Sequence, residues 1–272
     1  MSQQTNIISF FTSKGGAGKS ALTNVIANEI IYQAIKSGAP MPKVCVYDLD
    51  PQMTNKRKRD LEITQLKIDL DSDEFKSLSS DQQDEVRKFQ KQYFVLTNNT
   101  GFLPYSIKTV DTTDSEMVKV AIEDIEFGGY DYVFLDFPGT LEQDGLSDFA
   151  VLLNYLFIPT NIDLSTKLGT DYFIETMDGI DLPSLKDWKI LFNNVPTQRE
   201  THIPRMKAAL SQEHGAVPFL DTICKKTVFM ENSRTLLPIS ARINLNILEI
   251  KENPSTLSVV KLTKEITDIV NK

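Results

Sequence analysis

Residues 10–20 read FFTSKGGAGKS, and the rest of the chain is organised around this stretch. An apolar run from Ile7 to Phe11 enters it, and a helical pattern of apolar residues leaves it. A phosphate chain can dock at such a place, because glycine-rich backbone curls closely around an anion and a helix N-terminus presents N–H groups to it. In this pattern Lys19 reaches the β- and γ-phosphates of a nucleotide, and the Ser20 hydroxyl binds Mg²⁺.

The loop departs from the general phosphate-binding pattern at two positions. Ser13 replaces the first glycine of the pattern, and an additional lysine, Lys14, lies inside the loop. The sequence KGGAGKS resembles the deviant P-loop of the ParA/MinD family of ATPases. This resemblance implies that Lys14 crosses a dimer interface and contacts the nucleotide of the partner subunit. The alternative is a flexible loop without a ligand, and the strand before the loop and the helix after it argue against that alternative.

The composition is that of a folded chain, with 41% hydrophobic residues among 272. A net charge of −8 argues against a globally basic nucleic-acid binder but allows a local basic patch. Cys45 and Cys224 lack the spacing of a metal site and are too few for a disulfide framework. The N-terminus shows no signal pattern, and no apolar run approaches membrane-spanning length. We therefore expect a cytoplasmic protein that does not associate with membranes.

A second apolar run, Val44 to Tyr47, ends in DLDPQ at residues 48–52. Such a run is typical of a strand buried on both faces of a parallel sheet, and ligands bind at the carboxyl ends of these strands. Asp-x-Asp alone is common in turns. After a P-loop at this distance it resembles the switch I motif of the ParA group. The resemblance implies that Asp50 orients or activates the attacking water and that Asp48 lies near the water shell of Mg²⁺.

A third apolar run lies within YDYVFLDFPGT at residues 130–140, and its only strand-end carboxylate is Asp136. This has the character of a Walker B strand, in which Asp136 holds a Mg²⁺-bound water. Asp136 to Gly139 also fits Asp-x-x-Gly, in which the glycine N–H contacts a γ-phosphate and responds to its loss. The family usually has Asp-x-Pro-Pro-Ser here, so the loop departs from the family pattern. An isolated aspartate would be a turn residue, but the order of the three motifs favours the metal role.

The predicted strand at 189–194 ends in two asparagines. In the ParA group a polar residue at this strand end contacts the adenine, with Asn193 the better match and Asn194 the fallback. A guanine-specific Asn-Lys-x-Asp is missing, which favours ATP. An asparagine could instead merely cap the strand. The resemblance also implies that backbone near Ile223 lies beside the adenine.

The remaining segments carry weaker signals. The basic run at 56–59 could be a solvated helix face, a contact to DNA phosphates or a look-alike of a nuclear-localisation signal. The polar region 61–92 resembles the family least. We expect a strand at 93–97, a helix at 115–125, a strand-like segment at 217–223 and a helix at 255–270. Other candidate DNA contacts are Lys225, Lys226, Lys261 and Lys264.

Alternating strands and helices predict one doubly wound α/β domain over residues 1–272, with a mainly parallel sheet and helices on both faces, as in P-loop NTPases. The resemblance implies Mg²⁺-dependent ATP hydrolysis by in-line attack of water, and a homodimer that forms with ATP. It also implies non-specific DNA binding, association with the nucleoid if DNA is bound, and an unknown protein that stimulates hydrolysis. The cargo would be a plasmid, chromosome or mobile element. The expected catalytic residues are Lys14, Lys19 and Asp50; the nucleotide-binding residues are Lys14, Gly15, Gly16, Ala17, Gly18, Lys19, Ser20, Ala21, Gly139, Asn193 and Ile223; and the metal residues are Ser20, Asp48 and Asp136.

Three rival functions share the P-loop. A MinD-like ATPase that positions proteins at a membrane would need a C-terminal amphipathic anchor, and residues 255–270 are a poor match for one. An iron–sulfur carrier would need well-placed cysteines, which the chain lacks. A P-loop ligase or bacterial tyrosine kinase would need a substrate pocket or a terminal tyrosine cluster, and the tail at 268–272 has none.

Overall fold

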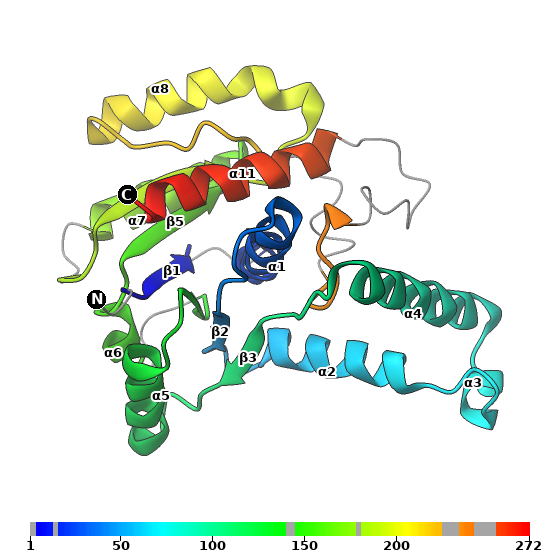
Figure 1. Cartoon of the computed structure of the whole chain (residues 1–272). Coiled ribbons are helices and arrows are strands. Elements are labelled where there is room, and N and C mark those ends of the chain that lie inside the picture. The colour runs from blue at the N-terminus through cyan, green and yellow to red at the C-terminus, as the bar shows by residue number, and fades with distance from the viewer. Residues whose placement is uncertain (1–3, 13–15, 140–144, 178–180, 225–233, 242–253) are drawn as a thin grey trace.

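The computed structural model of this chain contains a six-stranded sheet with helices on both faces (Figure 1). The structure describes residues 4–12, 16–139, 145–177, 181–224, 234–241 and 254–272. The strands are β1 (Asn6–Phe10), β2 (Val44–Asp48), β3 (Ser106–Thr109), β4 (Tyr132–Asp136), β5 (Tyr155–Thr160) and β6 (Asp187–Phe192). The helices are α1 (Lys19–Ser37), α2 (Thr54–Lys67), α3 (Asp73–Ser77), α4 (Ser80–Thr100), α5 (Ser115–Phe127), α6 (Leu146–Ala150), α7 (Leu164–Met177), the 3₁₀ helix η1 (Thr197–His202), α8 (Ile203–His214) and α11 (Pro254–Val270).

The strand order is β3-β2-β4-β1-β5-β6, and every neighbouring pair is parallel. All carboxyl ends of the strands therefore meet at one edge of the sheet. The register of β2 and β4 places Asp48 directly opposite Asp136 at that edge. The predicted doubly wound α/β fold is confirmed, and its parallel arrangement brings the motifs after β1, β2 and β4 together.

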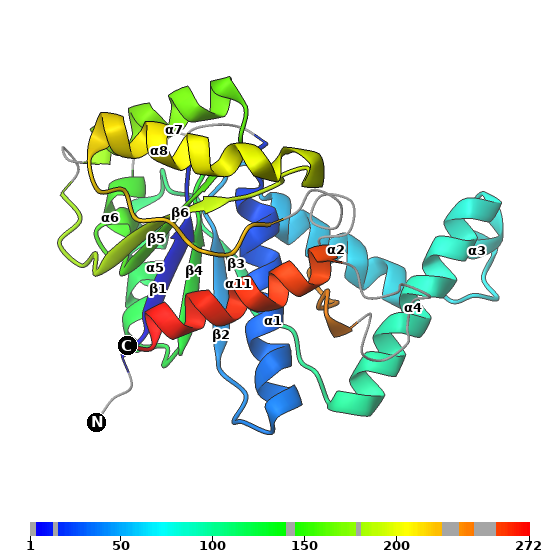
Figure 2. The same cartoon turned by 90° about the horizontal axis from the view of Figure 1, so that it is seen from above.

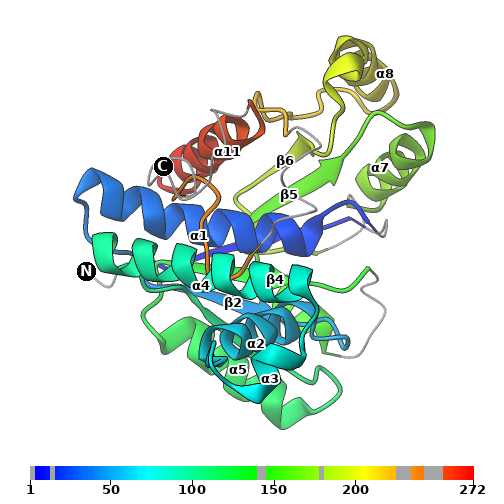
Figure 3. The same cartoon turned by 90° about the vertical axis from the view of Figure 1, so that its right-hand side faces the viewer.

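Side chains of each strand alternate between two apolar layers, one on each face of the sheet. At β1, Ile8 and Phe10 enter the first layer, whereas Ile7 and Phe11 enter the second. Because successive side chains point to opposite faces, a continuous apolar run serves both layers. The first layer includes side chains of α1, α4 and α11, and the second includes side chains of α5, α6, α7 and α8. Figure 3 shows α7 and α8 together beside β5 and β6.

The strand expected at 93–97 is wrong, because these residues lie inside α4. A capping box between Ser79 and Gln82 begins this helix, and Gly101, with φ of +64°, ends it. Phe89 and Leu96 are seven residues apart, so they share one helix face and both pack into the first layer. Helical spacing therefore outweighed the short run of β-forming residues.

The polar region 61–92 belongs to a helical arm made of α2, α3 and α4. Figures 1 and 2 show α2 and α4 running alongside one another, with α3 at the end farthest from the sheet. An arm with solvent on most sides needs few apolar residues, which explains its polar composition.

The segment at 217–224 is strand-like only in part. Ile190 N–H donates to the Pro218 carbonyl at 2.8 Å, and Leu220 N–H donates to the Ile190 carbonyl at 2.9 Å, so the segment lies along the open edge of β6. It forms one isolated bridge, between Ile190 and Phe219, rather than a full strand. The helices expected at 115–125 and 255–270 are confirmed as α5 and α11. Within the described ranges, the helices are all too short or too polar to cross a membrane.

Candidate active site

The phosphate loop runs from the end of β1 to the start of α1, as the glycine pattern predicts. Gly16 and Gly18 have φ of +75° and +87°, a region that favours glycine. A Cβ on Gly18 would also lie 2.7 Å from Nδ2 of Asn193, so this position has no room for a side chain. Ser13, Lys14 and Gly15 lie outside the described residues. The described part of the loop thus has the backbone that an anion cradle requires.

Lys19 begins α1 and folds back over the loop. Its Nζ donates to the Thr12 carbonyl at 3.0 Å. Burial lowers the pKa of Lys19, while the charges of Asp136 and Asp50 raise it. An ammonium with one backbone partner keeps two N–H groups for a further acceptor, so Lys19 can reach phosphate oxygens while it stays in place.

Asp48 and Asp136 form a buried carboxylate pair at the ends of β2 and β4. They are 0% and 1% exposed. Burial raises the pKa of Asp136 to about 7, with Asp48 adding to the rise and hydrogen bonds from Ser20 and Asn55 opposing it. Burial also raises the pKa of Asp48, against hydrogen bonds from the N–H groups of Lys56 and Asn55. Two carboxylates are thus held close together in a site that disfavours their charge.

This pair fits a divalent cation. The Oδ1 atoms of Asp48 and Asp136 are buried and have no hydrogen-bond partner among the described residues. The Ser20 hydroxyl lies close enough to Asp136 to lower the pKa of its carboxyl group, so it is near the same place. Carboxylate and hydroxyl oxygens are ligands that Mg²⁺ prefers, and a cation would relieve the cost of burying unpaired oxygens. Ser20, Asp48 and Asp136 are thus brought together as a candidate Mg²⁺ site.

Asp50 lies just outside the buried pair. Its Oδ1 accepts from the Gln52 N–H at 2.8 Å, and its carbonyl accepts from the Met53 N–H at 2.7 Å. Met53 has φ of +51°, which is uncommon for a residue with a side chain. The loop that carries Asp50 is therefore a tight and locally strained turn. Asp50 is half-buried, whereas Asp48 and Asp136 are fully buried.

Asn193 lies against the phosphate loop. Its Nδ2 donates to the Ala17 carbonyl at 2.8 Å, while its Oδ1 is buried without a partner in the described part of the chain. This contact supports the loop and leaves Oδ1 and the second N–H of Nδ2 for a ligand. Asn194 follows with φ of +58°, and Ile223 packs beside Phe192. Of the other expected nucleotide contacts, Ala17 and Ala21 are half-buried and Gly139 is exposed after β4.

Asn55 is part of this site, although the sequence did not single it out. Its N–H donates to Asp48 Oδ2 at 3.0 Å, and its Nδ2 donates to Asp136 Oδ2 at 2.5 Å. It stands in the first turn of α2, where asparagine is common for local reasons. One sequence offers no signal that separates this asparagine from an ordinary helix-start residue.

The basic run at 56–59 is not a uniform basic surface. Arg59 is 8% exposed, and its guanidinium binds Thr235 and the Tyr105 carbonyl. Lys56 forms an ion pair with Asp60. Only Arg57 of this run is classed as exposed, which leaves one open cation for phosphate contacts.

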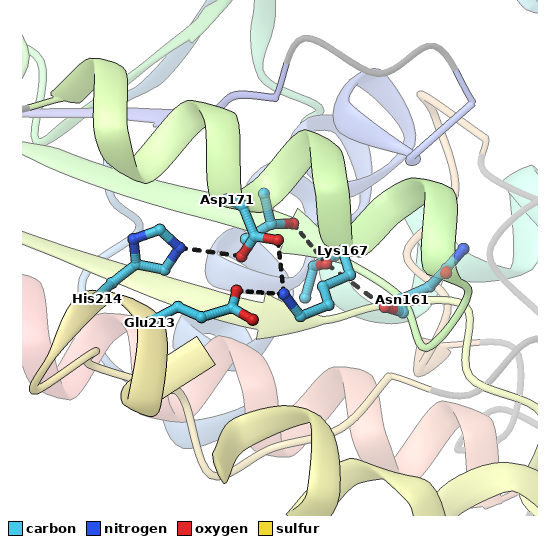
Figure 4. Close-up of polar contacts among 7 residues, drawn as sticks. Asn161, Lys167, Asp171, Glu213 and His214 are labelled. Atoms are coloured by element: carbon cyan, nitrogen blue, oxygen red, sulfur yellow. Dashed lines mark hydrogen bonds and ion pairs between the residues drawn. The ribbon is translucent and has the colours of Figure 1, made fainter. Parts of the chain in front are cut away.

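A second polar cluster joins α7 to α8 away from the phosphate loop (Figure 4). Asp171, Glu213 and His214 are close enough to share a metal ion. Lys167 occupies the space between them: its Nζ lies 2.7 Å from Asp171 Oδ2 and also bonds to Glu213. His214 Nε2 lies 3.0 Å from the other Asp171 oxygen. The ammonium already neutralises these carboxylates, so the cluster is an ion-pair link between two helices.

Comparison with known proteins bears on the family and the fold of this chain. A family model described as an AAA domain matches residues 5–190, and the chain belongs to this family. Together with its structural neighbours, the match defines a P-loop ATPase of the ParA/MinD type. No curated protein sequence matches the chain at a significant level.

Three solved structures illustrate the similarity of fold. The MinC:MinD cell division protein complex of Aquifex aeolicus aligns with a TM-score of 0.61 and 14% identity, over 97% of this chain and 96% of that chain. A putative plasmid partition protein of Borrelia burgdorferi bound to AMPPNP gives 0.52 and 18%, over 98% of each chain. Cobyrinic acid a,c-diamide synthase of Mycobacterium smegmatis with ADP and magnesium gives 0.52 and 14%, over 96% and 93%. At such identities the likeness is one of fold.

Proposed function

We propose that this protein is a Mg²⁺-dependent ATPase that switches between nucleotide states to partition or position DNA, with the whole chain acting as one ATPase domain. The observation that carries the proposal is a pair of buried carboxylate oxygens, on Asp48 and Asp136, which lack hydrogen-bond partners among the described residues and lie beside Lys19. Burying such a pair destabilises the fold, and a cation and phosphates bound there would offset this destabilisation.

Each residue has a defined task in hydrolysis. Lys19 and the loop N–H groups hold the β- and γ-phosphates, and Asp50 orients the water for in-line attack. Mg²⁺, when bound, neutralises charge on the phosphate oxygens. Release of Asp50 from the Gln52 N–H would turn its carboxylate toward the water. Among the described residues, no arginine side chain hydrogen-bonds to Lys19, Asp48, Asp50 or Asp136, so slow basal turnover is expected.

Dimerisation would allow other molecules to bind according to the nucleotide state of the protein. In the proposed switch Lys14 completes the site of the partner subunit, so ATP favours a homodimer and hydrolysis releases it. The dimer binds DNA without sequence preference, and a separate protein stimulates hydrolysis. The plasmid partition protein of Borrelia burgdorferi shares the fold, which supports the proposal without identifying a cargo.

The first test is ATP turnover with and without Mg²⁺. Lys19→Ala should reduce turnover about 100-fold or more, because it removes the charge that contacts the transferring phosphoryl group. Lys36→Ala, an exposed lysine in the last turn of the same helix, is the matched control and should leave turnover unchanged. Near-wild-type turnover in Lys19→Ala would exclude the P-loop assignment.

A further inference from the structure

We propose that Asn55 is a positioning residue for the cation site: it holds one oxygen of Asp48 and one of Asp136, so that their other oxygens stay directed at a single Mg²⁺. This inference rests on the proposed function. Asn55 is 1% exposed and contacts both carboxylates, which lie on different strands. No other described residue donates hydrogen bonds to both carboxylates.

The two oxygens of each carboxylate have different environments: Oδ2 accepts hydrogen bonds, and Oδ1 accepts none from the described residues. Asp48 Oδ2 accepts from the N–H groups of Asn55 and Lys56, at 3.0 and 3.1 Å. Asp136 Oδ2 accepts from Asn55 Nδ2 at 2.5 Å. Both Oδ1 atoms remain without a partner among the described residues. Since each Oδ2 is fixed, neither carboxylate can rotate its Oδ1 away without breaking a buried hydrogen bond.

A chain of donors fixes the orientation of the Asn55 amide. With a cation bound, the Asp136 carboxylate is ionised and only accepts, so Nδ2 must face it. Asn24 Nδ2 donates to Asn55 Oδ1 at 2.6 Å, and the Tyr105 hydroxyl donates to Asn24 Oδ1 at 2.5 Å. A flipped Asn55 would set oxygen against oxygen at Asp136 and N–H against N–H at Asn24. The network therefore permits one orientation, the one that serves the cation site.

The helix that carries Asn55 is itself anchored. Arg59 Nε donates to Thr235 Oγ1 at 2.8 Å, and Glu62 Oε2 accepts from the Thr235 and Leu236 N–H groups at 3.0 and 2.9 Å. Arg59 and Glu62 are buried, so a shift of α2 would break charged hydrogen bonds out of reach of water. A ligand-orienting residue on such a rigid element holds its geometry better than one on a loop.

The test uses the full chain saturated with ADP, with Mn²⁺ as a paramagnetic substitute for Mg²⁺ and binding followed by electron paramagnetic resonance. Asn55→Ala keeps the backbone N–H bond to Asp48 but removes the Nδ2 bond to Asp136. It should weaken Mn²⁺ binding about 10- to 100-fold, the usual loss when a ligand-orienting partner is removed. Its ADP affinity in EDTA should equal that of the wild type, because Lys19 and the loop are untouched. Mn²⁺ affinity equal to the wild type in Asn55→Ala would overturn the inference.

Two further variants separate positioning from general damage. Asn28→Ala removes another buried amide of α1, which donates to the Arg234 carbonyl at 3.0 Å, and should leave Mn²⁺ binding unchanged. Equal weakening in Asn28→Ala would overturn the inference.

Asn24→Ala removes the donor that orients Asn55 and should weaken Mn²⁺ binding less than Asn55→Ala does. If Asn55→Ala does not fold, unchanged Mn²⁺ binding in Asn24→Ala decides against the inference. A wild type that binds neither ADP nor Mn²⁺ would overturn the proposed function as well, whereas wild-type binding with an unaffected Asn55→Ala rejects only the role of Asn55.

Discussion

Asp50 differs from Asp48 and Asp136 because its carboxylate is partly exposed to solvent and accepts a hydrogen bond from the Gln52 N–H. It belongs to neither the buried carboxylate pair nor the phosphate loop. Asp50→Ala is therefore expected to bind ATP normally, to hydrolyse it about 100-fold more slowly, and to accumulate as an ATP-bound dimer. Turnover assays and size-exclusion chromatography with ATP check these outcomes.

The matched control for Asp50→Ala is Asp60→Ala, which removes an exposed carboxylate of α2 that forms an ion pair with Lys56. It should hydrolyse ATP at the wild-type rate. If Asp50→Ala hydrolyses normally or stays monomeric with ATP, the water-orienting role moves to Asp48 or elsewhere.

Much of the candidate site follows from single residues in the sequence. The glycines of the loop and the strand-end position of Asp136 are local features, so pattern and spacing predict where they lie. Asn55 could not be predicted, because its importance comes from contacts with residues of two other elements. Nor could the contact between Asn193 and the loop, which only the tertiary fold creates.

At the scale of elements, the edge strand β3 is tied to α5 by Asp124. Three groups donate to its Oδ2: Lys108 Nζ at 2.6 Å, the Tyr130 hydroxyl at 3.1 Å and the Tyr47 hydroxyl. Desolvation raises the pKa of Asp124, but hydrogen bonds from Lys108, Tyr47 and Tyr130 outweigh it and lower the pKa below its ordinary value. A carboxylate with a depressed pKa stabilises the fold above its unfolded pKa, and this contribution is lost as pH falls through the folded value.

Asp124→Asn should therefore destabilise the protein by about 1 kcal/mol at pH 7, a figure that allows for solvent screening of a partly exposed pair. The deficit should be constant between about pH 5 and 7 and should shrink only below about pH 4. Urea unfolding at several pH values measures it, with Glu123→Gln, an exposed carboxylate of α5, as the control for loss of charge. A deficit that disappears between pH 5 and 7 would contradict this account.

The elements differ in how far the sequence predicts them. Strands β2, β4 and β5 are buried along their whole length, so each reads as a continuous apolar run. Strand β3 is short, lies at the edge and reads SIKT, which is too polar to stand out. The arm was hard to predict for a similar reason: α4 uses few apolar side chains, and contacts distant in sequence decide its packing.

At the scale of the whole molecule, the acidic net charge restricts DNA binding to a local surface. Arg59 is buried, Lys56 is paired, and Lys225 and Lys226 lie outside the described residues. Arg57 remains in the basic run, and Lys261 and Lys264 remain on the exposed side of α11, which packs against α1. Lys264 is also paired with Asp268 at 2.6 Å, so Lys261 should contribute more to binding.

Two such cations bind DNA weakly at physiological salt, because each phosphate contact contributes little and is screened. A dimer presents two copies on one particle and raises affinity steeply without any new contact. We therefore expect unrelated DNA duplexes to be bound alike, with ATP but not with ADP, and progressively less as salt rises. Lys261→Glu should weaken binding more than Lys264→Glu, and neither should change ATP hydrolysis.

The control is Lys119→Glu, which changes an exposed lysine of α5 on the opposite face of the sheet and should bind DNA like the wild type. Fluorescence anisotropy with labelled duplexes at several salt concentrations measures all of these. An ATP-bound dimer without DNA affinity at low salt would reject the partition role, and ATP-dependent binding to lipid vesicles in its place would support a MinD-like positioning ATPase.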